Sequence, residues 1–306
     1  MTWEGAFTAL ATPFADDGSV DEAALRALVR YQVDGGITGL VACGTTGETP
    51  TLADPERLRI VEVVLDEVAG RCPVIAGAGG NDTAHVCGQA KDMAELGVTG
   101  LLSVSPYYNR PTQPGLVAHF SAVADATDLP VILYNVPGRT GGRIAVETAI
   151  HLAAHPRIVG IKEASGDISA FDALLAQAPD GFTVLSGDDA LTFPAMCLGA
   201  AGVISVVSNL EPTRMQRLVE AVLRGDQAEG RRLHRELSPL MAACFLTTNP
   251  APVKTGLSLL GMGSDRMRLP LVPPPPEVRA EMVRCLQALG HDIGDSGATS
   301  NTIRLA

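Results

Sequence analysis

The chain has 306 residues and a formal net charge of −11, with 46% hydrophobic and 19% charged residues. This length fits a barrel of alternating strands and helices, roughly 250 residues, with additional helices. The acidic balance and the lack of a basic cluster exclude a nucleic-acid partner, because phosphate groups are bound by clustered lysine and arginine. No apolar segment approaches the ~18 residues of a membrane span, and no basic, apolar leader opens the chain, so we expect no membrane association and a cytoplasmic location.

The six cysteines show no pattern typical of a metal site or a disulfide framework. No two of them form a CxxC pair, and most lie in apolar surroundings, as reduced core thiols do. We therefore expect neither zinc nor disulfides. The six are Cys43, Cys72, Cys87, Cys197, Cys244 and Cys285.

Short apolar runs alternate with amphipathic segments along residues 1–225. The first pair is a strand at 5–13 and a helix at 21–36, which starts with acidic residues and ends in glycine. Strict alternation with short links indicates a parallel sheet, and eight such units predict closure into a (β/α)8 TIM barrel. The other strands are expected at 38–43, 73–79, 100–106, 130–137, 158–162, 182–189 and 202–209, each followed by a helix.

Residues 226–290 are predicted to form a C-terminal helical addition. Two helices over 226–260 are interrupted at 247–252, and a stiff proline run at 273–276 precedes a last helix. Residues 291–306 lack periodicity, so we expect a mobile tail there, with a short return onto the body as the alternative.

Lys162 ends a short apolar run that is typical of a buried parallel strand. The chain has only three lysines against twenty arginines, so a lysine here is not a generic surface cation. Burial can make its amine neutral and nucleophilic, which is not possible for a guanidinium. The alternative is a strand-end lysine whose ammonium reaches solvent.

The turn CGTTGET at 43–49 follows the second predicted strand. Its two adjacent threonine hydroxyls are flanked by glycines that allow close backbone approach. Such a turn suits a small carboxylate or phosphate, held by hydroxyl and backbone N–H groups. The alternative is an ordinary glycine turn that caps a helix.

Three of the four tyrosines, Tyr107, Tyr108 and Tyr134, lie at the ends of the fourth and fifth predicted strands. Their hydroxyls can relay the protons that a carbinolamine gains and loses, although aromatic packing at the rim is an alternative. Arg139 lies in the glycine-bounded loop PGRTG. Its guanidinium could bind a substrate carboxylate or a surface acid.

Three other patterns are weaker. His151 and His155 have the spacing of a zinc pair, but no glutamate lies between them and they fall at the far end of a helix. The segment 77–82 lacks the full GxGxxG spacing of a dinucleotide site. The acidic pair at 188–189 lacks further metal ligands and fits a helix N-cap better.

The motifs GTTGE, SPYYNRP, YNVPGRTG, GIKEASGD and LSGDD occur in this order along the chain. Together they resemble the 4-hydroxy-tetrahydrodipicolinate synthase family, within the superfamily of pyruvate lyases that includes N-acetylneuraminate lyase. The resemblance extends to about residue 290. It implies condensation of pyruvate with L-aspartate 4-semialdehyde, the first committed step of diaminopimelate and lysine biosynthesis, with no cofactor and no metal.

The resemblance also implies roles for single residues. Lys162 would form the Schiff base with pyruvate, and Tyr134 would move protons at that centre. Thr46 would link Tyr134 to Tyr108 in a proton relay, and Thr45 and Thr46 would hold the carboxylate of pyruvate. The remaining substrate-binding positions are Arg139, for the carboxylate of aspartate semialdehyde, Gly187 and Ile204.

An assembly is implied as well. In the family, the residue that corresponds to Tyr107 reaches into the active site of a neighbouring subunit. We therefore expect dimers that pair into a homotetramer.

Many relatives are inhibited by lysine, which binds in a cleft between two subunits. Lysine-sensitive members offer a glutamate and two histidines there, where this chain has His85, Asp54 and Arg57. A histidine in place of the anion and an added arginine disfavour a cationic ligand, so we expect weak inhibition by lysine or none. The other positions of the cleft keep the family residue or a close substitute: Asn81, Tyr107 and Thr49, which replaces a serine.

Three alternative functions remain open at this stage. A sialic-acid lyase and a 2-keto-3-deoxy sugar acid aldolase or dehydratase would share the lysine, the tyrosine and the threonine turn. Arg139 favours a short carboxylated aldehyde over a polyhydroxylated chain. A non-catalytic barrel that senses a keto acid would leave the lysine, the two tyrosines and the two threonines unexplained.

Overall fold

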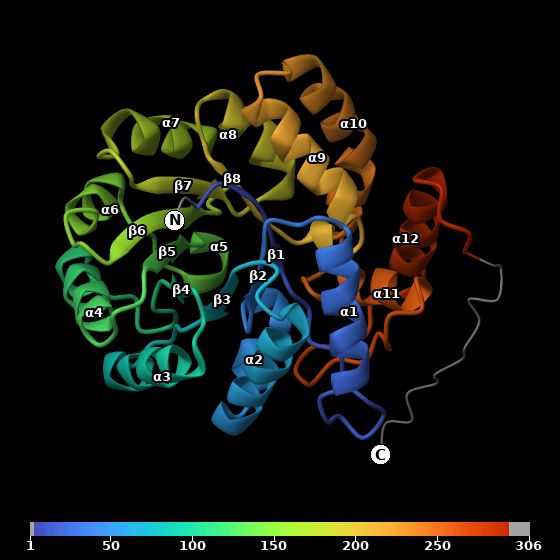
Figure 1. Cartoon of the computed structure of the whole chain (residues 1–306), viewed down its shortest axis with the longest axis horizontal. Coiled ribbons are helices and arrows are strands. Elements are labelled where there is room, and N and C mark those ends of the chain that lie inside the picture. The colour runs from blue at the N-terminus through green and yellow to red at the C-terminus, as the bar shows by residue number, and fades with distance from the viewer. Residues whose placement is uncertain (1–2, 294–306) are drawn as a thin grey trace.

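Eight parallel strands close into a barrel in the computed structural model, which describes residues 3–293 (Figure 1). The strands follow one another in sequence order, and the first pairs with the last. This confirms the predicted (β/α)8 barrel. The strands are β1 (Gly5–Ala9), β2 (Gly39–Ala42), β3 (Val74–Gly77), β4 (Gly100–Val104), β5 (Val131–Asn135), β6 (Ile158–Glu163), β7 (Thr183–Ser186) and β8 (Gly202–Ser205).

Helices surround the barrel, and several start at residues suited to a cap. The side chains of Asp21, Asp82 and Asp167 accept hydrogen bonds from backbone N–H groups in the first turns of α1, α3 and α7. The helices are α1 (Glu22–Asp34), α2 (Asp54–Val68), α3 (Thr83–Leu96), α4 (Gln113–Asp125), the short α5 (Pro137–Thr140), α6 (Val146–Leu152), α7 (Ile168–Gln177), α8 (Thr192–Cys197) and α9 (Pro212–Leu223).

The hydrophobic core has two parts. The larger part lies between the strands and the outer helices, and the smaller part fills the interior of the barrel. Tyr134 and Ile204 belong to the interior cluster, which places them on the same side of the sheet. The other buried members of this cluster are Trp3, Phe7, Ala9, Val41, Ile75, Leu102, Ile132, Val136 and Leu185.

Strand β1 is shorter than the predicted strand at 5–13. It ends at Ala9, and the backbone N–H of Ala11 donates to the side chain of Asn209 at 3.0 Å. The Asn209 amide also donates to the carbonyl of Ala9 at 2.8 Å. The Asn209 side chain thus takes the place of a neighbouring strand as the hydrogen-bond partner of the backbone, and the strand ends at Ala9. The apolar pattern of the sequence could not indicate this early end.

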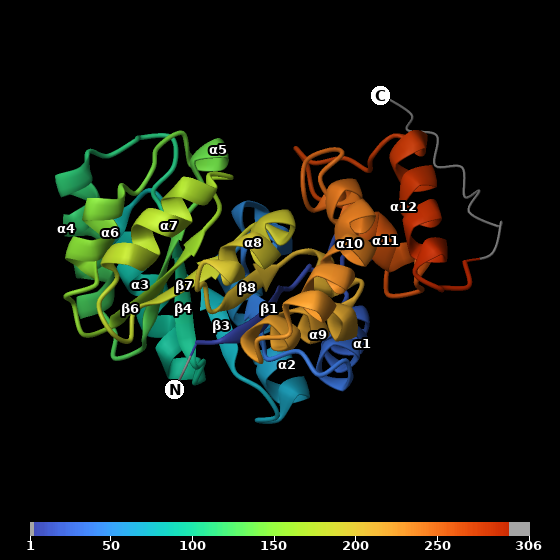
Figure 2. The same cartoon turned by 90° about the horizontal axis from the view of Figure 1, so that it is seen from above.

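Three further helices, α10 (Gln227–Ala243), α11 (Ala251–Leu259) and α12 (Pro276–Ala288), form the C-terminal addition. Figure 2 shows them together on the side of the barrel that α1 and α9 cover. The predicted break at 247–252 contains the start of α11. Of the predicted tail, the imidazole of His291 contacts Glu211 and Ile293 is buried, whereas residues 294–306 lie outside the described part of the chain.

None of the helices within residues 3–293 is long and apolar enough to cross a membrane.

Candidate active site

Lys162 and Tyr134 lie side by side at the ends of two neighbouring strands. They are register partners on β6 and β5, so their side chains point to the same side of the sheet, into the barrel. Lys162 is only 5% exposed, and its Nζ lies 4.3 Å from the centroid of the Tyr134 ring. The Lys162 amine therefore lies directly against the tyrosine predicted to move protons.

A buried hydrogen-bond network fixes the end of β6. The Asn135 amide donates to Glu163 Oε2 at 2.8 Å, and the backbone N–H of Ser165 donates to Glu163 Oε1 at 2.6 Å. Asn135 Oδ1 in turn accepts from the backbone N–H of Ile144 at 2.9 Å. The residue that follows Lys162 is thus held from both sides, which limits movement of the lysine backbone.

Gly187, at the end of β7, makes room for the lysine side chain. Its backbone N–H donates to the carbonyl of Glu163 at 2.7 Å. A Cβ on Gly187 would lie 2.8 Å from Lys162 Cε and 2.7 Å from Ala164 Cβ. Both distances are well below the ordinary contact distance of about 3.5–4.0 Å between non-bonded carbon atoms. Ile204 is fully buried in the barrel interior, in the same cluster as Tyr134.

Asp188 caps the 3-10 helix η3 (Asp189–Leu191) after β7, as predicted, whereas Asp189 does not act as a cap. Asp188 Oδ1 accepts from the backbone N–H of Ala190 at 2.9 Å. Asp189 is buried, and its Oδ2 accepts from the backbone N–H groups of Val206 and Val207, both at 3.0 Å. Burial raises the pKa of the Asp189 carboxyl. Within residues 3–293, no group of three or more His, Cys, Asp or Glu side chains could hold a metal ion.

The threonine turn forms a 3-10 helix, η1 (Thr45–Gly47). Thr46 is only 2% exposed, and its hydroxyl accepts a hydrogen bond from the side-chain amide of Asn249 at 3.0 Å. Thr45 is half-buried and lines the same cavity as Tyr134 and Arg139. The two neighbouring hydroxyls thus have different surroundings, one bound to the protein and one facing the cavity.

Arg139, on α5, is exposed at the mouth of the barrel. Its Nη2 donates to the backbone carbonyl of Asn249 at 3.2 Å. Among the ion pairs of residues 3–293 none includes Arg139, so a carboxylate-binding face of the guanidinium is open.

Asn249 connects these two parts of the site, and it comes from the C-terminal addition. It is 4% exposed, contacts Thr46 through its side chain and Arg139 through its carbonyl, and its Oδ1 has no hydrogen-bond partner. A buried amide oxygen without a partner carries a desolvation cost, which the other contacts of Asn249 must offset.

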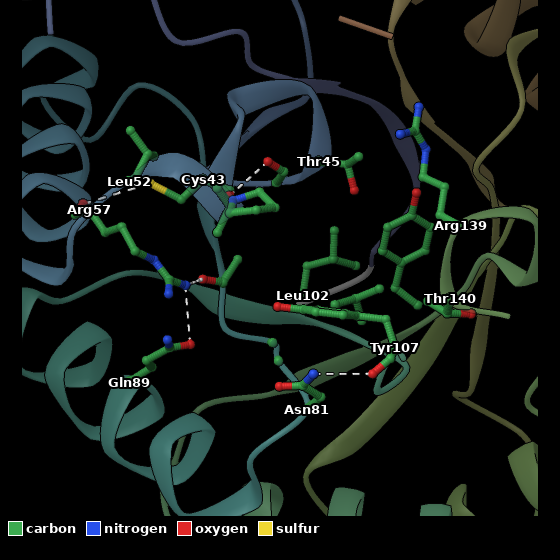
Figure 3. Close-up of a pocket in the computed structure, with 18 of the residues that line it drawn as sticks. Cys43, Thr45, Leu52, Arg57, Asn81, Gln89, Leu102, Tyr107, Arg139 and Thr140 are labelled. Atoms are coloured by element: carbon green, nitrogen blue, oxygen red, sulfur yellow. Dashed lines mark hydrogen bonds between the residues drawn. The ribbon is translucent and has the colours of Figure 1, made fainter. Parts of the chain in front are cut away.

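A cavity of about 450 Å³ extends from Thr45, Tyr134 and Arg139 to the predicted inhibitor cleft, and Lys162 lies behind Tyr134 rather than on its lining. Figure 3 shows Thr45 and Arg139 at one end and Arg57 and Gln89 at the other. Cys43 also lines it, and burial raises the pKa of its thiol to about 12. The cavity is therefore continuous from one predicted site to the other.

The cleft end is built around a buried arginine. Arg57 is 5% exposed, and its Nη2 donates to the carbonyl of Gly77 at 2.9 Å and to Gln89 Oε1 at 3.1 Å. The Asp54 carboxylate lies 3.7 Å from Arg57 Nη1 and 3.6 Å from His85 Nε2. The Asp54 carboxylate is thus shared between two basic side chains. Thr49 Oγ1 donates to the carbonyl of Gly44 at 2.8 Å.

The two adjacent tyrosines differ in exposure. Tyr107 is 36% exposed, lines the cavity of its own chain, and its carbonyl accepts from Asn81 Nδ2 at 3.2 Å. Tyr108 is 89% exposed with a φ of +70° and does not line that cavity.

Comparison with known proteins decides the family. The sequence model described as the Dihydrodipicolinate synthetase family matches residues 2–289. The chain belongs to this family. The resemblance seen in the motifs is thereby confirmed, and the dihydrodipicolinate synthetase fold accounts for the barrel and the C-terminal helices together.

Individual relatives cover nearly the whole chain. A 4-hydroxy-tetrahydrodipicolinate synthase of Koribacter versatilis is 47% identical over 291 residues, which is 95% of this chain and 97% of that protein. The crystal structure of dihydrodipicolinate synthase from Thermotoga maritima matches with a TM-score of 0.92 and 43% identity, covering 94% of this chain and 98% of that one. The enzyme from Cyanidioschyzon merolae with lysine bound matches with a TM-score of 0.91 and 40% identity, at 94% and 98% coverage.

Within this dihydrodipicolinate synthetase fold, the structure brings Lys162, Tyr134, Thr45 and Arg139 to one mouth of the barrel, as the motifs predict. It does not bring Tyr108 to the cavity of its own chain. Sequence reasoning missed two contributors: Asn135, which lies within the YNVPGRTG motif but was given no role, and Asn249, which lies outside the motifs. Asn249 lies in the predicted break at 247–252, and nothing in that break points to the barrel mouth.

Proposed function

We propose that this chain is a class I lyase that condenses pyruvate with L-aspartate 4-semialdehyde to give 4-hydroxy-tetrahydrodipicolinate, at the start of diaminopimelate and lysine biosynthesis. The observation that carries the proposal is the Lys162 amine, 5% exposed and 4.3 Å from the Tyr134 ring centroid. Membership of the family supports it, since the named relatives are 4-hydroxy-tetrahydrodipicolinate synthases.

The chemistry begins with attack of the neutral Lys162 amine on the ketone carbon of pyruvate. The resulting carbinolamine loses water and becomes an iminium ion, for which a proton must reach the departing hydroxyl. The iminium then accepts the electron pair released when the pyruvate methyl loses a proton, which gives an enamine. The enamine carbon attacks the aldehyde carbon of the second substrate, which forms the new C–C bond, and the aldehyde oxygen takes up a proton. The amino group of that substrate then attacks the regenerated iminium carbon and displaces the Lys162 amine, which closes the ring and frees the enzyme.

Tyr134 is the group best placed to move these protons, because it is the register partner of Lys162. Its relay partner in this chain is Thr45 rather than Thr46. The support is that Thr45 lines the cavity with Tyr134, whereas Thr46 is 2% exposed and does not line it. Thr46 then serves to hold the turn that receives the pyruvate carboxylate.

Arg139 binds the carboxylate of aspartate semialdehyde. Its support is an exposed guanidinium on the cavity wall that donates to a neutral carbonyl, that of Asn249, and pairs with no carboxylate among residues 3–293. Arginine and carboxylate groups match in a bidentate geometry, which would orient the aldehyde toward the enamine.

The assembly is proposed to be a homotetramer in which Tyr108 completes the relay of a neighbouring subunit. Tyr108, rather than Tyr107, is the residue with a free side chain, since Tyr107 lines its own cavity and Tyr108 is 89% exposed. An exposed tyrosine with a positive φ is strained as well as poorly packed, which supports a role in contact with another chain. The predicted cytoplasmic location stays a prediction.

A substrate panel tests the proposed function. The purified chain is given excess pyruvate and either aspartate semialdehyde or a polyhydroxylated sugar-acid aldehyde, and products are followed by mass spectrometry, with Lys162→Ala as the inactive control. We expect condensation with aspartate semialdehyde at a kcat/KM far above that for the sugar-acid aldehydes. A preference for the sugar-acid aldehydes would show that the second substrate is wrong.

A further inference from the structure

Glu48, the last residue of the GTTGE motif, has an unusual backbone. With φ +54° and ψ +34° it lies in the left-handed region, between η1 and a second 3-10 helix, η2 (Thr49–Thr51). Glycine would adopt this conformation without strain, whereas a side chain makes it costly. A glutamate persists in such a place only where other interactions hold it there.

Those interactions come from the C-terminal addition. The Glu48 side chain has no solvent exposure, and its Oε1 lies 2.6 Å from Nζ of Lys254, on α11, whose side chain is 1% exposed. Glu48 Oε2 accepts from the backbone N–H of Arg268 at 3.1 Å. The Lys254 ammonium also lies 4.2 Å from the centroid of the Phe14 ring. Both buried charges are thus paired, and removal of either one would leave the other uncompensated.

Arg268 extends the same connection along the turn. Its Nη1 donates to the carbonyl of Thr51 at 2.8 Å, and its guanidinium pairs with Glu56, at the start of α2, at 2.5 Å. The carbonyl of Glu48 itself accepts from the backbone N–H of Thr51 at 3.0 Å. The C-terminal segment therefore contacts the turn at its centre and at its end.

We propose that the buried Glu48–Lys254 pair is a positioning device, through which the C-terminal helices hold the threonine turn in the shape that binds the pyruvate carboxylate. Glu48 follows Thr45 and Thr46 by three and two residues, and its N–H donates to the carbonyl of Thr45 at 3.1 Å. A shift of Glu48 is transmitted directly to the turn that carries both threonines. Neither charged residue lines the cavity, so the pair acts through the turn. This inference rests on the proposed function.

The test uses Glu48→Gln and Lys254→Met in the full-length chain, with Glu211→Gln as the matched control. Glu211 is also a buried carboxylate in an ion pair, with Arg214 at 2.7 Å, but it does not contact the turn. Each variant is measured well below its Tm for KM of pyruvate, for the rate of borohydride trapping of pyruvate on Lys162, and for hydrogen–deuterium exchange of residues 43–52.

In Glu48→Gln and Lys254→Met we expect KM for pyruvate to rise about tenfold or more, the size of a lost hydrogen bond to a charged group. Trapping should slow by a similar factor, and the turn should exchange faster. Glu211→Gln should lower Tm but leave all three readouts within about twofold of wild type.

A folded Glu48→Gln with unchanged KM, trapping rate and exchange would overturn the proposal, and would do so even if Lys254→Met failed to fold. A wild-type chain that pyruvate and borohydride do not modify would instead show the proposed function to be wrong. In that case the exchange of residues 43–52 in Glu48→Gln still decides whether the pair holds the turn.

Discussion

A methyl group added at Gly187 should disable the enzyme while leaving it folded. The Cβ of Gly187→Ala would lie 2.8 Å from Lys162 Cε and 3.0 Å from Lys162 Cγ. Non-bonded carbon atoms prefer separations of about 3.5–4.0 Å. The same Cβ would lie 2.7 Å from Ala164 Cβ, which cannot rotate away, so relief of the contacts requires a small backbone shift at the ends of β6 and β7 as well as displacement of the flexible lysine side chain.

The expected shift of the amine is roughly 1 Å, the difference between the built and the ordinary contact distances. A misplacement of this size costs about a hundredfold in rate, or ~2.7 kcal/mol in the activation barrier. Overpacking of the site should lower the free energy of unfolding by about 1–3 kcal/mol, which a barrel of this size tolerates.

The assay compares kcat/KM, the rate of pyruvate trapping and Tm for Gly187→Ala and Gly142→Ala. Gly142 lies on the loop after α5, and a Cβ there would meet no atom within 4 Å. We expect trapping and kcat/KM to fall together in Gly187→Ala and to stay near wild type in Gly142→Ala. Activity of Gly187→Ala within about threefold of wild type would refute the packing of Lys162 against this glycine.

Three further predictions follow from the site. In steady-state kinetics, Arg139→Ala should raise KM for aspartate semialdehyde roughly ten- to a hundredfold, from a loss of ~1.5–3 kcal/mol, with little change in KM for pyruvate. The control Arg143→Ala, at an exposed position, should change neither KM. Because Arg57 and His85 already neighbour the Asp54 carboxylate, initial rates at rising lysine should show half-inhibition no lower than ~1 mM. A much lower value would contradict this interpretation of the cleft. Burial raises the pKa of the Cys43 thiol to about 12, so its thiolate is scarce at pH 8 and becomes abundant only as the pH approaches 12. Iodoacetamide should therefore modify the exposed Cys197 first, which mass spectrometry of the native protein would show.

The strand and helix alternation was enough to predict the barrel, because each unit carries its own periodicity. The contact between Lys162 and Tyr134 also follows from the sequence, because each residue lies at the end of its strand and the two strands are neighbours in a barrel. The sequence pattern could not show the register of the strands or the orientation of individual side chains. The exposure of Tyr108 depends on its left-handed backbone, and the different partners of Thr45 and Thr46 depend on where Asn249 lies.

The contribution of the C-terminal helices was the main omission. Lys254 looks in sequence like one more lysine outside the active site, yet it is 1% exposed and paired with Glu48 across about two hundred residues of chain. Its apolar neighbours, Val253 and Leu257 among them, were the one available signal of burial. Lys254→Ala is therefore a poor control for Lys162→Ala, and exposed Lys91 is the better one.

The central assignment, a Schiff base on Lys162, is tested most directly by chemical trapping. Wild type, Lys162→Ala and Lys91→Ala are each incubated with pyruvate and borohydride, digested and mapped by mass spectrometry. The mechanism predicts one pyruvate-derived modification, on the peptide that contains Lys162, in wild type and Lys91→Ala, and none in Lys162→Ala. Full trapping in Lys162→Ala, or modification of another lysine in wild type, would contradict it.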